Sequence, residues 1–122
     1  DKAAENRQRH KDYDAHCRNQ EAKQFYNSTA WKTLRERVLA RDNHIDIYLY
    51  VMEKRIVPAD TVHHIVELSE DYTKRLDIDN LISISEATHS MISKVYKHQA
   101  ERTQMQKTLR ECMQEYKKRV AG

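Results

Sequence analysis

Residues that break regular secondary structure are scarce in this chain, whose 122 residues include one Gly and one Pro. A turn-rich β architecture needs many such residues, so their scarcity favours long helices. No apolar run approaches the 18 or so residues of a transmembrane helix, which argues against a membrane protein. Cys17 and Cys112 are isolated, so they form neither a CxxC zinc site nor a disulfide framework, and reduced thiols of a cytosolic protein are expected.

Charge is abundant and unevenly distributed. Charged residues make up 34 % of the chain and hydrophobic residues 39 %, which is too apolar for a disordered chain and fits one domain with a small core. The net charge is +3 over residues 1–55, −5 over residues 56–93 and +5 over residues 94–122. Basic arms around an acidic middle suit a nucleic-acid enzyme, although ordinary solvated helix faces explain the same charges.

Helices are predicted in the first third of the chain. Residues 1–24 are polar and helix-friendly. Asn27 or Ser28 can cap a second helix, in which apolar residues recur at helical spacing among basic ones until residues 42–43 stop it.

The middle of the chain is predicted to contain strands. The apolar stretch at 45–52 alternates poorly and is interpreted as a strand or a packed loop. β-branched residues predict strands at 55–57 and 61–66, joined through Pro58, and a further strand at 80–84.

The last third is predicted to be helical. Ser85 is placed to cap a helix, and an apolar stripe at steps of three to four residues continues without a breaker, so one long helix or two stacked helices run from 86 to about 119. Such a stripe is more typical of a core or a dimer seam than of a catalytic site.

A pattern of three histidines and an asparagine lies on these predicted elements. His63 and His64 are adjacent on a strand, Asn80 opens the next strand, and His89 lies one turn into the following helix. This arrangement can bring imidazoles together around a metal. Neighbouring strand residues point to opposite faces, so His63 and His64 have different tasks unless the backbone bends. On spacing alone, structural histidines explain the pattern as well.

Three blocks of the sequence, at 25–42, 55–68 and 76–83, resemble in the same order the phage-type HNH, or ββα-metal, endonucleases. The second block contains Val62-His63-His64-Ile65, and the third contains Asn80-Leu81-Ile82-Ser83. The resemblance spans about residues 25–93.

The resemblance implies an α+β fold. It is mostly helical, with a small ββα-metal (HNH, or His-Me finger) core made of a two-stranded antiparallel sheet and a helix, flanked by long helices. The predicted organisation is an N-terminal helical arm at 1–24, an HNH nuclease core at 25–93 and a C-terminal helical extension at 94–122.

The resemblance also assigns roles to the four residues. His64 matches the general base, Asn80 the central asparagine that holds the loop and the base, and His63 and His89 the ligands of one divalent metal ion (Mg, Mn, Ni or Zn). A metal on two imidazoles suits phosphodiester hydrolysis, and a histidine near its ordinary pKa suits proton abstraction from water.

The chain departs from these relatives at their structural zinc. They carry one CxxC pair before the first strand and a CxxCH after the second. Here the second reads Ser85-Glu86-Ala87-Thr88-His89, and the first is placed at Ile47 and Tyr50. No structural zinc is therefore expected, and an apolar plug is predicted to replace it, made of Ile47, Leu49, Tyr50 and Val51. Glu67, where relatives usually have Pro, is a strand-end residue or an extra carboxylate near the metal.

DNA is the expected partner, and the resemblance adds a role beside phage DNA-packaging proteins in the bacterial host cytoplasm, with no membrane partner. Candidate phosphate contacts are the basic residues Arg35, Arg37, Arg41, Lys94 and Lys97.

Three functions compete on this sequence. The first is an active metal-dependent DNA endonuclease or nickase, favoured because His63, His64, Asn80 and His89 are all present. The second is a retired HNH domain that binds DNA or a protein, which fits the absence of the zinc ligands. The third, a helical interaction module, leaves the His/Asn pattern unexplained.

Overall fold

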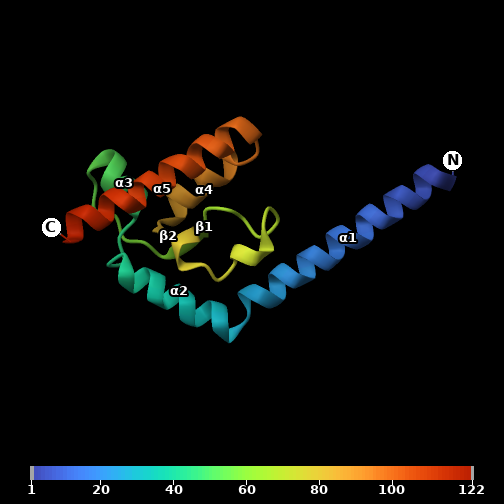
Figure 1. The fold of residues 1–122 in the computed structure, drawn as a ribbon, viewed down its shortest axis with the longest axis horizontal. Coiled ribbons are helices and arrows are strands. Elements are labelled where there is room, and N and C mark those ends of the chain that lie inside the picture. Colours follow the sequence, from blue (N-terminus) through green and yellow to red (C-terminus); the bar gives the residue numbers. More distant parts are fainter. Residues whose placement is uncertain (1, 122) are drawn as a thin grey trace. The chain divides into compact units, whose positions relative to one another are not determined.

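The computed structural model describes residues 2–121, without the side chains at 6, 8 and 10–14, so the outermost residues of the predicted arm and extension lie outside it. The elements follow one another along the chain as shown in Figure 1. They are α1 (Lys2–Tyr26), α2 (Thr29–Arg41), α3 (Ile47–Glu53), β1 (Thr61–His64), two 3-10 turns (Tyr72–Lys74 and Ile78–Asn80), β2 (Leu81–Ile84), α4 (Glu86–Val95) and α5 (Gln99–Ala121).

The chain divides into two compact units, residues 1–33 and residues 34–122. The first unit contains α1 and the beginning of α2, where the rings of Phe25 and Trp31 pack 5.3 Å apart. The backbone N–H of Trp31 donates to Ser28 Oγ at 3.2 Å, so Ser28 is the residue that caps α2. None of the described helices is long and apolar enough to cross a membrane.

The second unit is built around the antiparallel pair β1–β2, in which Thr61 lies opposite Ile84 and His64 opposite Leu81. One face of the pair contacts the end of α2. There Ser83 donates its N–H to Asp42 Oδ2 at 3.1 Å and its hydroxyl to the Val38 carbonyl at 3.3 Å. These bonds fix β2 against the helix.

The core lies on the other face of the sheet, between the strands and α3, α4 and α5. Its buried members come from five segments of the sequence: Ile47, Ile65, Ile82, Ile84, Ile92, Tyr96, Leu109, Cys112, Met113 and Tyr116. Ser85 caps α4 by accepting from the Thr88 N–H, as predicted, and α4 and α5 are two helices rather than one. The mostly helical α+β class with a two-stranded antiparallel sheet is confirmed.

The prediction of a strand or packed loop at 45–52 was wrong, because the segment forms α3. Asp46 caps this helix by accepting the Leu49 N–H at 2.9 Å, and Lys54 ends it in the left-handed conformation at φ 55°. An Asp directly before an apolar run is an N-cap signal, and it outweighed the β-like composition of the run.

The predicted strand at 55–57 was wrong, and the predicted strand at 61–66 was too long, since β1 covers only Thr61–His64. Residues 55–57 form no strand, and their surroundings contain one isolated bridge between Ile45 and Pro58. A proline has no N–H to extend such a ladder. β1 ends at His64. The Ile65 N–H still bonds to the Asn80 carbonyl at 2.8 Å, but the Val66 N–H and carbonyl then pair with the side chain of Asn80 and not with a strand.

Candidate active site

β1 ends in two buried histidines that point to opposite faces of the sheet. His63 lies opposite Ile82 and His64 opposite Leu81, and each histidine is 4 % exposed. Because side chains alternate along a strand, His63 faces α4 and α5 while His64 faces the loop that precedes β2. The strand thus separates the two imidazoles into different surroundings.

The side chain of His63 lies beside His89 and Tyr96. Its ring centroid is 5.5 Å from that of His89 and 5.2 Å from that of Tyr96. Burial, with smaller contributions from His89 and His64, lowers the pKa of His63 to about 3, so the imidazole is neutral at physiological pH. Its Nε2 is buried and has no hydrogen-bond partner among the described residues. A buried polar nitrogen without a partner is costly unless a ligand occupies it.

His89 is carried to this position by the turn between β2 and α4. β2 ends at Ile84, Ser85 caps the helix, and the His89 N–H closes the first turn on the Ser85 carbonyl at 2.9 Å. The half-buried His89 side chain therefore returns towards the end of β1. A strand, a cap and one helical turn are sufficient to pair it with His63.

His64 is held by the loop on the other side of the strand. Its Nε2 lies 2.9 Å from the Arg75 carbonyl, which can only accept, so Nε2 carries the proton and Nδ1 is the basic nitrogen. Burial lowers the pKa of His64, and the hydrogen bond to Arg75 partly opposes this. The imidazole is consequently neutral at neutral pH.

Asn80 ties both ends of the loop between the strands. Its Oδ1 accepts the Val66 N–H at 2.8 Å, and its Nδ2 donates to the carbonyls of Val66 at 2.9 Å and Lys74 at 3.4 Å. The Lys74 carbonyl immediately precedes the residue that holds His64. Replacing this buried amide would release the loop that contacts His64.

Glu67 follows the histidines and is half-buried. Its pKa is raised by burial and by Glu70, while Arg102 and His89 oppose the shift. The Glu67 carboxylate therefore interacts electrostatically with His89. Among the described residues, no group of three or more His, Cys, Asp or Glu side chains is gathered as metal ligands would be.

A polar cluster occupies the place where the resemblance puts the zinc cysteines. Asp46, fully buried, accepts the N–H and the hydroxyl of Ser85, both at 2.8 Å, and Ser85 bonds to Thr88 Oγ1 at 3.1 Å. The residue that faces Ser85 is therefore Asp46, one position before the predicted Ile47. The apolar plug is present as well, since Ile47 and Leu49 are buried and Tyr50 and Val51 pack against the core. The turn that begins α3 and the turn that begins α4 are thus joined by hydrogen bonds in addition to apolar contacts.

We expect the fold to be insensitive to chelation, since these contacts join the two turns without thiolates. Thermal melting with and without a strong chelator should give superimposable curves, apart from a small effect of any catalytic metal. The control is the same chelator saturated beforehand with zinc, which has no capacity left to remove a transition metal from the protein. Collapse of the fold on chelation would contradict this prediction.

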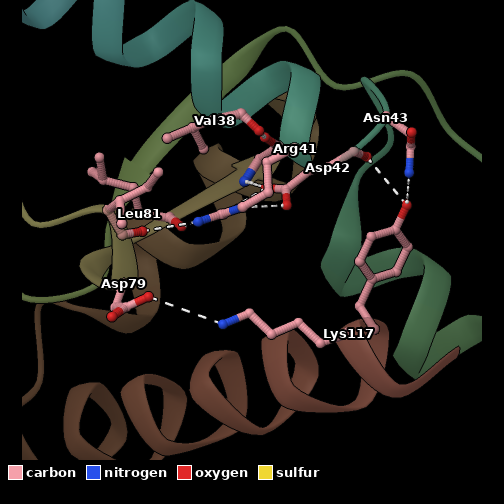
Figure 2. Close-up of polar contacts among 10 residues, drawn as sticks. Val38, Arg41, Asp42, Asn43, Asp79, Leu81 and Lys117 are labelled. Carbon is pink, nitrogen blue, oxygen red and sulfur yellow. Dashed lines mark hydrogen bonds and ion pairs between the residues drawn. The ribbon is translucent and has the colours of Figure 1, made fainter. Parts of the chain in front are cut away.

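Arg41, a predicted phosphate contact, uses most of its guanidinium within the fold. Nε and Nη2 donate to the two carboxylate oxygens of Asp42 at 2.7 and 2.8 Å, and Nη2 also donates to the Leu81 carbonyl at 2.7 Å (Figure 2). Nη1 donates to the Ile78 carbonyl at 2.9 Å. Four of its five donors are thereby engaged. Arg41 ties α2 to β2 and to the turn before it.

The other predicted phosphate contacts are more accessible. Arg35 is half-buried and bonds to Glu36 and to the Asp60 carbonyl. Arg37, Lys94 and Lys97 are exposed, so their cationic groups are open to solvent.

The sequence did not point to three residues of this site. Asp46 was identifiable as an N-cap, as argued above for α3. Arg75 acts through its backbone carbonyl, which no side-chain pattern reveals. Tyr96 follows the helical stripe as an ordinary core residue would, and its contact with His63 depends on the packing of α4 against β1.

A solved structure of known activity has a similar fold. The HNH endonuclease of the deep-sea thermophilic bacteriophage GVE2, crystallised with a manganese ion, is 44 % identical to the chain, with a TM-score of 0.67. The match covers 71 % of this chain and 94 % of that one. The chain belongs to the HNH endonuclease family. The match confirms the predicted family and the predicted enzyme class, so this HNH protein is a nuclease. No family model and no curated protein matches its sequence.

Proposed function

We propose that this HNH protein is a metal-dependent DNA endonuclease or nickase in which His64 is the general base and His63 and His89 hold one divalent metal ion. The observation that carries the proposal is the buried Nε2 of His63, which has no hydrogen-bond partner in the described part of the chain, with the His89 ring 5.5 Å away. A metal ligand must be a neutral imidazole with an available lone pair, and burial keeps His63 in that form.

The donor set fits such an ion. Imidazole nitrogens suit transition metals better than magnesium, which prefers oxygen ligands. When bound, the ion supplies Lewis-acid stabilisation of charge on the scissile phosphate and the departing oxygen. The manganese ion in the related phage enzyme supports this choice.

Hydrogen bonds with neighbouring residues set the tautomer and the position of the proposed base, His64. With Nε2–H donating to the Arg75 carbonyl, Nδ1 of His64 accepts the proton of the attacking water. The same carbonyl then stabilises the imidazolium that forms, as an acceptor opposite a positive ring. Asn80 supports the base indirectly, since it fixes the Lys74 carbonyl beside Arg75.

Plasmid nicking tests the proposal against a retired domain. Supercoiled plasmid should be converted to the nicked or linear form with Mn²⁺, Mg²⁺ or Ni²⁺, and EDTA should abolish the conversion. A protein that retards plasmid DNA on a gel but never cleaves it with any of these ions would instead support the retired domain.

His89→Ala should weaken metal binding, because it removes one of two proposed protein ligands. Calorimetric titration with Mn²⁺ should show the weakening, and excess metal should partly restore cleavage. His98→Ala is the matched control, since His98 is exposed and lies in the turn between α4 and α5. Parent-like manganese affinity in His89→Ala would contradict its role as a ligand.

DNA binding is proposed to use the exposed cations. Changing Arg37, Lys94 and Lys97 together to Gln should weaken binding similarly across DNA sequences and reduce the salt slope by about 1 for each phosphate that these side chains neutralise. A control of equal charge changes three other exposed lysines, Lys54, Lys107 and Lys118. An equal decrease of the slope in this control would show that net charge, not these positions, governs binding.

We also propose a cellular location and one protein partner. The phage source of the related enzyme supports action inside a bacterial host cell. Partnership with phage DNA-packaging proteins rests on the family resemblance.

A further inference from the structure

The backbone carbonyl directly after the two histidines receives two hydrogen bonds from the C-terminal helical region. The Ile65 carbonyl accepts the Tyr96 hydroxyl at 2.8 Å and the Gln106 side-chain amide at 3.0 Å. Ile65 is fully buried, Tyr96 is 3 % exposed and Gln106 is 9 % exposed. Both lone pairs of this carbonyl are thus used by side chains beyond the ββα motif.

Tyr96 also contacts His63 directly. The two rings meet edge to face, at 5.2 Å between centroids and 68° between planes. The Tyr96 hydroxyl is the donor of this bond and the Ile65 carbonyl its acceptor, since a tyrosine is ordinarily protonated at physiological pH. One side chain therefore both borders the His63 imidazole and fixes the backbone two residues further on.

The backbone of Tyr96 is held by hydrogen bonds as well. The Arg102 guanidinium donates to the Tyr96 carbonyl through Nε at 2.9 Å and Nη2 at 2.6 Å. Gln106 is similarly held, since its amide also donates to the Glu70 carboxylate at 3.1 and 3.2 Å. Both donors to Ile65 are therefore oriented by further contacts and have little freedom to move.

We propose that Tyr96 and Gln106 are positioning residues that aim the His63 imidazole at the metal shared with His89, so that the C-terminal helices control metal affinity. The inference rests on the proposed function of His63 and His89. Groups that orient a ligand typically alter metal affinity by about 10–100-fold when they are removed. Here the orientation acts through one ring contact and one backbone carbonyl, so about 10-fold is expected for a single change.

The test uses Tyr96→Phe, which keeps the ring against His63 and removes only the hydrogen bond. Tyr116→Phe is the matched control. Tyr116 is also a buried member of the core, on α5. Its hydroxyl accepts from Asn43 Nδ2 at 2.7 Å and donates to the Asp42 carbonyl, away from His63. Gln106→Met removes the second donor at nearly constant volume.

Mn²⁺ affinity of the full chain is measured by calorimetry, together with unfolding by urea and the metal dependence of cleavage. Tyr96→Phe and Gln106→Met should each bind Mn²⁺ about 10-fold more weakly and regain the parent cleavage rate at saturating Mn²⁺, whereas Tyr116→Phe should bind like the parent.

Three results would overturn the inference. Parent-like affinity in both Tyr96→Phe and Gln106→Met would remove the positioning role while leaving the proposed function intact. An equally weakened affinity in Tyr116→Phe would show that any buried hydroxyl acts through stability. A parent protein that binds no Mn²⁺ and cleaves no DNA would refute the proposed function, and this inference with it.

Discussion

His64→Ala should lower the rate of DNA cleavage by roughly 10²–10⁴-fold, the usual contribution of a general base, while Mn²⁺ binding keeps the parent affinity. The separation of the two effects follows from the strand. His63 points towards His89, and His64 points to the opposite face, where it bonds to the Arg75 carbonyl at 2.9 Å. Removing the base therefore leaves the proposed metal ligands in place.

Single-turnover cleavage and calorimetry, run on the same preparations, measure both effects. Asn80→Ala should give an intermediate decrease of the rate, because Asn80 holds the loop and does not react. His98→Ala, at an exposed position, is the control. If His64→Ala abolished Mn²⁺ binding and His63→Ala did not, the two roles would be reversed. If every variant cleaved like the parent, the proposed function would fail.

Asp46→Ala should cost about 3 kcal/mol or more of unfolding free energy. The carboxylate is fully buried and accepts three hydrogen bonds, from the Leu49 N–H and from the N–H and hydroxyl of Ser85. Hydrogen bonds to a charged group contribute about 1.5–3 kcal/mol each, and removing the acceptor leaves buried donors unsatisfied. Two helix starts would be weakened together, because Asp46 caps α3 and Ser85 caps α4.

Urea unfolding measures this destabilisation. Asp46→Asn should fall between the parent and Asp46→Ala, since one oxygen remains as an acceptor. Asp79→Ala is the control: its side chain is 76 % exposed and lies 4.0 Å from Lys117 Nζ (Figure 2), an ion pair worth less than about 1 kcal/mol. A parent-like midpoint for Asp46→Ala would mean that apolar packing alone joins the two turns.

Strand alternation and helix capping, which depend on neighbouring residues only, were enough to predict the secondary structure that carries the histidines. Alternation along a strand predicts that His63 and His64 diverge, and the Ser85 cap predicts where α4 begins and hence where His89 lies. The structure has β2 and α4 within a residue of those positions. Each of these features depends on residues fewer than six positions apart, which a sequence pattern can register.

The remaining features depend on pairs far apart in the sequence. Asp46 meets Ser85 across 39 residues, Arg41 meets the Leu81 carbonyl across 40, and Tyr96 meets the Ile65 carbonyl across 31. Composition suggested a strand where Asp46 caps a helix, and a phosphate contact where Arg41 bonds within the fold. A side chain's hydrogen-bond partners depend on which segments pack together, and no local pattern contains that information.

The sequence by itself therefore determined the order of strand, strand and helix and the histidines that these elements carry, because period-two alternation and capping act over a few residues. Only the tertiary structure decided what surrounds those histidines. Burial between the sheet and the α4–α5 pair makes His63 a neutral imidazole with an unpartnered nitrogen, and the loop before β2 gives His64 a carbonyl partner. Both depend on long-range packing, which sets the dielectric surroundings and the hydrogen-bond partners of each ring.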